Sequence, residues 1–250
     1  MPSLRHHLLR LLRIALRLRA HPLVLTEGAL LVIAPHPDDE TLGCAGLIHR
    51  QRLADQRVSC LFLTDGSASH RNHPRVTPQT LAALRADEAR AATSVLGVAP
   101  HELEFLGLPD GKLPHLTPTA REQAIQDIAA CVTRLAPATI LITHRHDGSS
   151  EHEASFPLLH AALRQIGQPI RVIEYPVWTL YSPRLLFRFF LNTGHLYRVH
   201  HPSLRTLKTR ALANYVTQFA PLAPWTEPVQ SADFANAFSH NDEFFVEIPL

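Results

Sequence analysis

Cysteine is scarce in this sequence. The 250 residues include three cysteines, Cys44, Cys60 and Cys131, which lie far apart and form no Cys-x-x-Cys pair. An odd number of isolated cysteines argues against a disulfide framework and against a thiolate metal site, and it fits a reducing compartment. We therefore expect three buried thiols that pack as small hydrophobic groups.

Long apolar runs are also missing. No stretch of roughly 18 uncharged apolar residues occurs, so no transmembrane helix is expected. Arginines interrupt every apolar run between Leu8 and Ala20, so the N-terminal segment lacks the hydrophobic core of a signal peptide. The sequence predicts a cytoplasmic protein, either free or peripheral at the inner face of the membrane.

The formal net charge of the chain is only +2, but its charges are unevenly distributed, because two basic segments contain no acidic residue. Residues 1–26 contain five arginines, and residues 175–226 contain five arginines and one lysine. These eleven positive charges leave the rest of the chain at −9. Such segregation indicates an anionic partner, either a phospholipid surface or a phosphate on the substrate. No nucleic-acid motif accompanies the charge, so nucleic acid is not an expected partner.

Residues 1–26 have the pattern of a basic amphipathic helix that precedes a single domain over residues 27–250. Their apolar and basic side chains fall on two stripes at helical spacing. Such a helix can lie on an anionic membrane surface or dock against the protein's own body, and both interpretations stay open. The apolar stripe comprises Leu4, Leu8, Leu11, Ala15 and Leu18, and the basic stripe comprises His6, Arg10, Arg13 and Arg17.

Five short apolar segments have the length and composition of buried strands, and helical patterns separate them. Repeated strand–helix–strand units predict an α/β fold, a Rossmann-like, mostly parallel sheet of order 3-2-1-4-5 with helices on both faces. A less regular C-terminal extension follows, with a helix over 203–219 and a last strand at 243–248. The predicted strands are 30–34, 58–64, 103–106, 138–143 and 170–176, and the helices are 39–53, 77–97, 117–135 and 152–166.

The end of the first strand carries the most informative residues. The segment 30–40, Leu-Leu-Val-Ile-Ala-Pro-His-Pro-Asp-Asp-Glu, places one histidine and three carboxylates where a parallel strand meets the ligand crevice. His36 and Asp39 can bind one divalent metal ion, and Asp38 stays available as a general base. The alternative is an ordinary strand-to-helix turn with Asp38 or Asp39 as the N-cap.

A second polar cluster follows the fourth strand, more than one hundred residues later. In the predicted order the first and fourth strands are neighbours, so the two clusters meet at the point where the winding reverses. His152 is best placed as the third metal ligand because it enters a helix there, and His144 and His146 are its rivals. Two histidines and one carboxylate suit a catalytic zinc ion, and Fe2+ tolerates the same ligands. Hydrolysis of an amide follows naturally from these groups.

These residues resemble the signatures of the PIG-L/LmbE-like family of metal-dependent de-N-acetylases, which act on N-acetylglucosamine attached to lipids or small molecules. The resemblance covers residues 28–220, and its most specific element is the segment 34–40. Other similar elements are 63–66, 108–111, 174–178 and 208–218, together with Arg85 and Glu88. The resemblance implies that His36, Asp39 and His152 bind the metal, that Asp38 is the general base, and that Arg85 and Asp110 hold the sugar.

Two of these positions also have ordinary structural explanations. Arg85 and Glu88 are three residues apart, so they can form an ion pair on an exposed helix face. Asp110 stands in the turn sequence Leu-Pro-Asp-Gly, where an aspartate often bonds to its own backbone. The sequence alone favours neither explanation over sugar binding.

The fourth loop departs from the family pattern at one position. The family commonly has His-Pro-Asp-His there, and its first histidine is thought to stabilise the oxyanion or protonate the leaving group. This chain has Ser149-Ser150-Glu151-His152 instead. We predict that His146, held protonated by the neighbouring Asp147, takes over this catalytic role. Otherwise Ser149 donates a weaker hydrogen bond, or the activity is reduced.

The sequence therefore predicts a zinc-dependent hydrolase that removes the N-acetyl group from an N-acetylated amino sugar on a lipid-linked or otherwise anionic carrier. Ser149 motivates an alternative, a catalytically weak, metal-containing sugar-recognition module. A nucleotide-binding Rossmann domain is disfavoured, because the first strand-to-helix turn lacks Gly-x-Gly-x-x-Gly and its carboxylates would repel a pyrophosphate.

Overall fold

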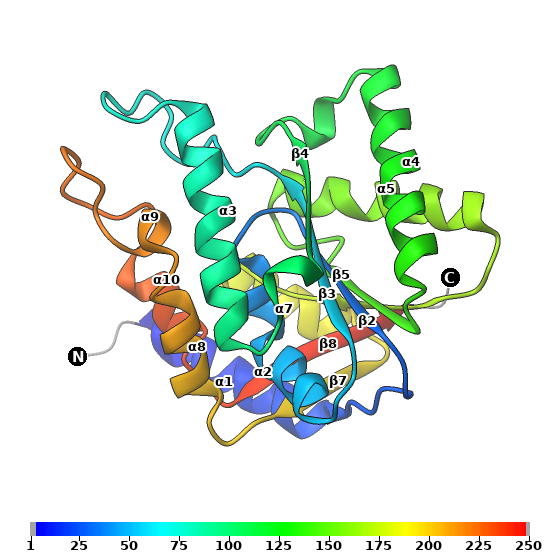
Figure 1. Ribbon diagram of the computed structural model, residues 1–250. Coiled ribbons are helices and arrows are strands. Elements are labelled where there is room, and N and C mark those ends of the chain that lie inside the picture. Colours follow the sequence, from blue (N-terminus) through cyan, green and yellow to red (C-terminus); the bar gives the residue numbers. More distant parts are fainter. Residues whose placement is uncertain (1–3, 249–250) are drawn as a thin grey trace.

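The computed structural model describes residues 4–248, and within them one eight-stranded sheet forms the centre of the molecule (Figure 1). The strands lie side by side in the order β1-β7-β8-β6-β5-β2-β3-β4. In chain order they are β1 (His21–Pro22), β2 (Leu30–Ala34), β3 (Val58–Thr64), β4 (Leu103–Leu108), β5 (Thr139–Thr143), β6 (Arg171–Tyr175), β7 (Leu196–His200) and β8 (Asp242–Ile248).

The predicted core of the sheet is confirmed. Strands β4, β3, β2, β5 and β6 are parallel neighbours, which is the order 3-2-1-4-5 expected for the five predicted strands. The winding reverses between β2 and β5, so the loops that follow these two strands open at the same edge. This edge is where ligands bind in open α/β sheets.

The C-terminal extension adds further strands to the same sheet. The predicted last strand is β8, and it runs antiparallel to both β6 and β7. Sequence patterns did not indicate β1 or β7, because β1 has two residues and the burial of β7 does not alternate along the strand. The helix predicted over 203–219 is interrupted at residues 213–215, and the buried side chain of Tyr215 donates a hydrogen bond to Glu40.

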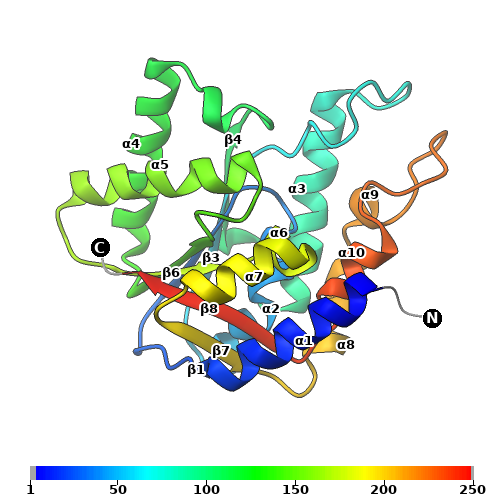
Figure 2. The same cartoon turned by 180° about the vertical axis from the view of Figure 1, so that it is seen from behind.

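Helices cover both faces of the sheet, as predicted (Figures 1 and 2). On one face Leu31 and Ile33 of β2 pack with residues of α4 and α5, and on the other Leu30 and Val32 pack with residues of α1, α2 and α8. The helices are α1 (Leu4–Arg19), α2 (Asp39–Leu53), α3 (Pro78–Val95), α4 (Pro118–Leu135), α5 (Ser150–Ile166), α6 (Trp178–Tyr181), α7 (Pro183–Asn192), α8 (Leu204–Leu212), α9 (Val216–Phe219) and α10 (Ala232–Ala237).

Local signals explain where several elements begin. Thr77 and Thr117 cap α3 and α4, because each side chain accepts a hydrogen bond from the N–H three residues later and a proline follows at the first helical position. The three cysteine thiols are buried, as expected. Within residues 4–248, no helix is long and apolar enough to span a membrane.

The N-terminal helix docks on the protein by a different face from the stripe seen in the sequence. Leu9, Leu12 and Leu16 of α1 are buried in the main core. Arg13 holds the helix in place by donating hydrogen bonds to the carbonyl oxygens of Leu180 and Ala237, at 2.7 and 2.9 Å. Most of the stripe predicted from the sequence is left on the outside, namely Leu4, Leu8, Leu11 and Leu18.

Candidate metal centre and active site

The turn between β2 and α2 gathers polar side chains at the carboxyl end of the sheet. Asp38 immediately precedes α2 with φ of 127°, a backbone conformation that is strained for a residue other than glycine. Although Asp38 occupies the N-cap position, its carboxylate makes no capping hydrogen bond. The alternative of an ordinary capping turn therefore does not describe this segment.

Three side chains that can bind a metal ion converge at this end of the sheet. Asp39 Oδ2 lies 3.2 Å from His36 Nδ1 and 3.2 Å from His152 Nε2. His36 and Asp39 follow β2, whereas His152 lies in the first turn of α5 after the neighbouring strand β5. One ligand atom from each residue lies within 4.8 Å of the others, which is close enough for all three to bind one ion. The structure thus brings together the three predicted metal ligands.

Asp147 fixes the orientation of His152. The Asp147 carboxylate is fully buried, and its Oδ2 lies 2.7 Å from His152 Nδ1. Three backbone N–H groups, of Val177, Trp178 and Thr179, donate hydrogen bonds to the same carboxylate at 2.9–3.0 Å. A metal-binding histidine typically donates its second ring N–H to such a carboxylate, which leaves the other nitrogen free for the metal.

The residues present fit a divalent metal ion such as zinc. His152 Nε2 is buried and, among the described residues, has no aligned hydrogen-bond partner, although Asp39 is nearby. Burial would lower the pKa of His152, but the Asp39 and Asp147 carboxylates outweigh it and raise the pKa to about 10. A metal ion that binds at Nε2 therefore replaces a proton. Two imidazole nitrogens and one carboxylate oxygen are ligands that zinc prefers.

Asp38 stands beside this group without belonging to it. Burial raises the pKa of Asp38 to about 8, and the charge of Arg85 opposes the shift. Arg85 is 2% exposed and lies behind the carboxylate, with Nη2 3.2 Å from Asp38 Oδ2. It also donates to the carbonyl oxygens of Pro37 and Gly66. A Cβ at Gly66 would lie 2.5 Å from Arg85 Nη1, so this turn requires glycine.

Arg85 therefore contacts Asp38, the predicted base, directly. The sequence-based alternative, an ion pair with Glu88, is wrong, because Glu88 accepts hydrogen bonds from the N–H and hydroxyl of Thr217 instead. Arg85 is among the residues that line the cleft, although nearly all of its surface is buried.

Asp110 and Glu151 form the opposite side of the centre. Asp110 Oδ1 lies 3.3 Å from His36 Nε2, and Oδ2 accepts a hydrogen bond from the Ala68 N–H at 2.8 Å. Glu151 Oε2 lies 4.0 Å from the same His36 nitrogen. Both carboxylates thus face the histidine rather than the backbone of their own turn. Glu151 was not predicted from the sequence, although it stands next to His152.

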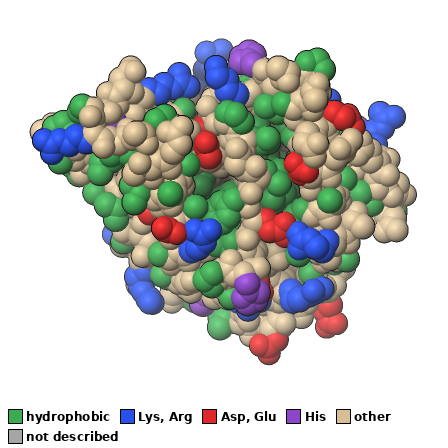
Figure 3. All heavy atoms as spheres, turned by 45° about the horizontal axis from the view of Figure 1, so that its top comes forward, with side chains coloured by type: hydrophobic (Ala, Val, Ile, Leu, Met, Phe, Trp, Pro, Cys, Tyr) green, Lys and Arg blue, Asp and Glu red, His purple; other side chains and the backbone are tan. Residues whose placement is uncertain are grey.

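A cleft of about 380 Å³ opens beside these residues. Its lining includes His36, Asp38, Asp110, Ser149 and Trp178. Figure 3 looks toward the end of the molecule where these loops lie, and the surface there is hollowed, with acidic and basic side chains around the hollow.

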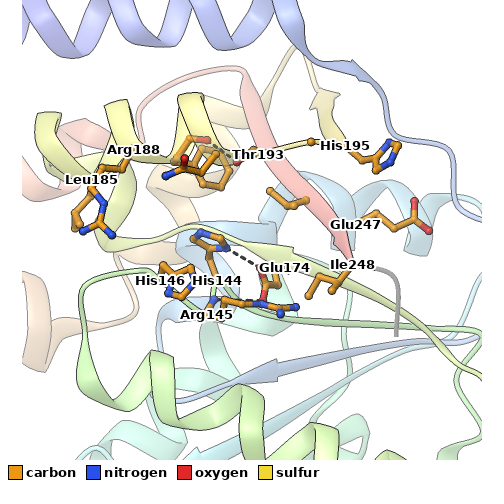
Figure 4. A pocket seen from close by; sticks show the side chains of 14 residues that line it. His144, Arg145, His146, Glu174, Leu185, Arg188, Thr193, His195, Glu247 and Ile248 are labelled. Atoms are coloured by element: carbon orange, nitrogen blue, oxygen red, sulfur yellow. Dashed lines mark hydrogen bonds and ion pairs between the residues drawn. The ribbon is translucent and has the colours of Figure 1, made fainter.

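His144 and His146 lie outside this cleft. They line a separate cavity of about 330 Å³ between α7 and the end of β8 (Figure 4), and none of its lining residues lines the metal cleft. His144 is paired with the buried Glu174 at 2.7 Å. The structure thus places His146 away from the metal centre, contrary to the prediction that it acts there.

The reason is the shape of the loop. The prediction assumed that the extended chain continues beyond Thr143, but the Asp147 N–H donates to the His144 carbonyl oxygen at 3.1 Å and closes a turn. This turn sends Asp147 inward to His152, so Asp147 is not the partner of His146. The residue of this loop that lines the metal cleft is Ser149, whereas His146 does not line it.

The fold and the site together define a class of protein, an α/β domain with a His-Asp-His group at the point where its winding reverses. The family described as PIG-L, GlcNAc-PI de-N-acetylase, matches residues 31–163. The chain belongs to this family. A probable N-acetyl-α-D-glucosaminyl L-malate deacetylase 2 of Bacillus anthracis is 30% identical over 154 residues, which are 60% of this chain and 66% of that protein.

Two solved structures share the fold. The N,N'-diacetylchitobiose deacetylase of Pyrococcus horikoshii is 20% identical with a TM-score of 0.61, and the match covers 86% of this chain and 79% of that one. The 4-carboxy-2-hydroxymuconate hydratase GalB of Pseudomonas putida is 17% identical with a TM-score of 0.62, covering 85% and 83%. Likeness at these identities shows the fold alone, and a fold does not determine the reaction.

Proposed function

We propose that this protein is a zinc-dependent hydrolase that removes the acetyl group from an N-acetylated amino sugar, a substrate class suggested by the names of its relatives. The observation that carries the proposal is a buried carboxylate, Asp38, next to three converging metal donors. Fe2+ is the alternative metal, because it accepts the same ligands.

Each of these side chains has a separate role in the proposed amide hydrolysis. A zinc ion held by His36, Asp39 and His152 would act as a Lewis acid on the amide carbonyl and lower the pKa of water. Asp38 takes the proton of the attacking water and returns it to the leaving nitrogen. Arg85 keeps the Asp38 carboxylate in place, and Asp110 is the polar group available to a sugar hydroxyl.

The carrier of the sugar is proposed to be anionic or lipid-linked, and the protein to work at the cytoplasmic side of a membrane. Arg71 lines the cleft, and the two acid-free segments make other parts of the chain basic. A phosphate group on the substrate would complement this charge.

The test is to measure acetyl release from a panel of N-acetylglucosamine glycosides and sugar phospholipids with zinc-loaded protein. Mass spectrometry should detect loss of one acetyl group, replaced by hydrogen, and a strong chelator should abolish the reaction. Tight sugar binding without amine formation at saturating zinc would instead support the alternative, the sugar-recognition module.

Changing Ser149 to histidine is expected to raise kcat by up to about 100-fold. Ser149 lines the cleft and can offer the oxyanion only a neutral hydrogen bond, and one missing oxyanion donor can cost 100-fold or more. Steady-state kinetics on the best substrate of the panel measures the change. His146→Ala is the control and should leave kcat unchanged, since His146 lies in the other cavity. A fall in kcat in that control would show that His146 takes part in catalysis, as the sequence predicted.

A further inference from the structure

Helix α1 has two apolar faces. Leu9, Leu12 and Leu16 bury one face in the core. A helix that only docks on a protein body needs one apolar stripe, with polar side chains on the rest of its surface. Docking therefore leaves the second face unexplained, although it carries five large apolar side chains: Leu4 is 86% exposed, Leu18 84%, Leu11 64%, Leu8 45% and Ile14 41%.

Helix α7 extends this exposed surface. Phe187 and Leu191 are four residues apart on α7, hence on one side of it, and are 50% and 57% exposed. The two helices lie side by side (Figure 2), because Arg19 donates hydrogen bonds to the carbonyl oxygens of Phe190 and Thr193. We call these seven exposed apolar side chains, five on α1 and two on α7, the α1–α7 face.

Positive charge surrounds the α1–α7 face. Helices α1 and α7 contain no acidic residue. Arg10, Arg184 and Arg188 are exposed, and they form no ion pair with any residue in the range 4–248. An apolar stripe bordered by unpaired arginines is typical of a helix that lies flat in the interface of an anionic bilayer.

We propose that the α1–α7 face docks the protein on the surface of a membrane rich in anionic phospholipid. The leucines enter the boundary between headgroups and acyl chains, and the arginines contact the headgroups. A second copy of the chain fits less well, because a symmetric pairing of this face would bring two acid-free, arginine-rich surfaces together.

Docking in this way would leave the short helix α10 between the docked helix α1 and the active-site cleft. Helix α10 connects the two regions: Phe234 lines the cleft, while Asp233 and Ala237 line a groove against α1. A lipid-linked sugar could therefore reach the cleft from the membrane on which the protein sits. This last step rests on the proposed function, whereas docking itself does not.

Sedimentation of the full chain with vesicles tests the docking. The protein should bind vesicles of phosphatidylcholine with phosphatidylglycerol, bind pure phosphatidylcholine weakly, and dissociate progressively as salt is raised, because exposed charges are screened within about 10 Å at 0.1 M. The triple variant Leu4→Gln, Leu11→Gln, Leu18→Gln should lower the partition coefficient at least about tenfold, since it removes three apolar anchors.

A matched variant controls for general loss of surface hydrophobicity. Leu53 and Leu84 are exposed on α2 and α3, so Leu53→Gln with Leu84→Gln should leave vesicle binding unchanged. Equal losses in both variants, salt-independent binding or no binding would overturn the proposal. A dimer that light scattering detects in the unaltered protein and not in the triple variant would also overturn it, because the face would then bind a second copy of the chain. Both variants should still deacetylate a soluble substrate; if the unaltered protein does not, the proposed function fails independently of docking.

Discussion

Changing Asp38 to asparagine is expected to lower kcat for amide hydrolysis by about a thousandfold, within the range assigned to general acid–base catalysis. The same carboxylate takes the proton from water and returns it to the leaving nitrogen, so an amide of the same shape blocks both transfers. Zinc should still bind at full stoichiometry, because Asp38 is not one of the three converging donors. Single-turnover kinetics and metal analysis of the same sample measure the two quantities.

Loss of the fold would also lower kcat, and thermal unfolding distinguishes that cause from loss of the base. Asparagine keeps a side-chain oxygen that can accept the hydrogen bond from Arg85 and removes a charge that burial disfavours, so the variant should still be folded at the assay temperature. Asparagine also tolerates the positive φ of this position. A zinc-loaded Asp38→Asn protein that retains most of its activity would show that another group is the base.

The position of the metal centre could be predicted from topology. Short apolar strands separated by helices determine a parallel sheet, and the reversal of its winding brings the loops after β2 and β5 together. His36 and His152 are far apart in the chain, yet each follows a strand that ends at this point. Their proximity depends first on strand order, and in the common doubly wound order the first and fourth strands are neighbours.

The directions of side chains in loops could not be predicted in the same way. The turn from His144 to Asp147 depends on three backbone N–H groups of residues 177–179, thirty residues later, which donate hydrogen bonds to the Asp147 carboxylate. No periodic pattern records such a contact. The N-terminal helix is a second example, because its buried and exposed stripes both consist of leucines and only the shape of the body selects between them.

Changing Asp147 to asparagine is expected to weaken zinc binding by about 10- to 100-fold, the usual effect of removing the partner of a metal-binding histidine. The carboxylate accepts the Nδ1 proton of His152, so Nε2 keeps its lone pair for the metal. An asparagine has one carbonyl oxygen for the three backbone donors and the imidazole, so the ring loses its fixed orientation. Competition with a fluorescent chelator measures the zinc affinity.

The effect should be on metal affinity rather than on the chemical step. At saturating zinc the Asp147→Asn protein should recover most of its kcat, because Asp38 and Arg85 are untouched by the change. Glu153→Gln is the matched control. Glu153 is an exposed carboxylate on α5, the helix that contains His152, but it accepts a hydrogen bond from the Gly148 N–H rather than from His152. The interpretation fails if both variants bind zinc equally well, because Asp147 would then support only the backbone of residues 177–179.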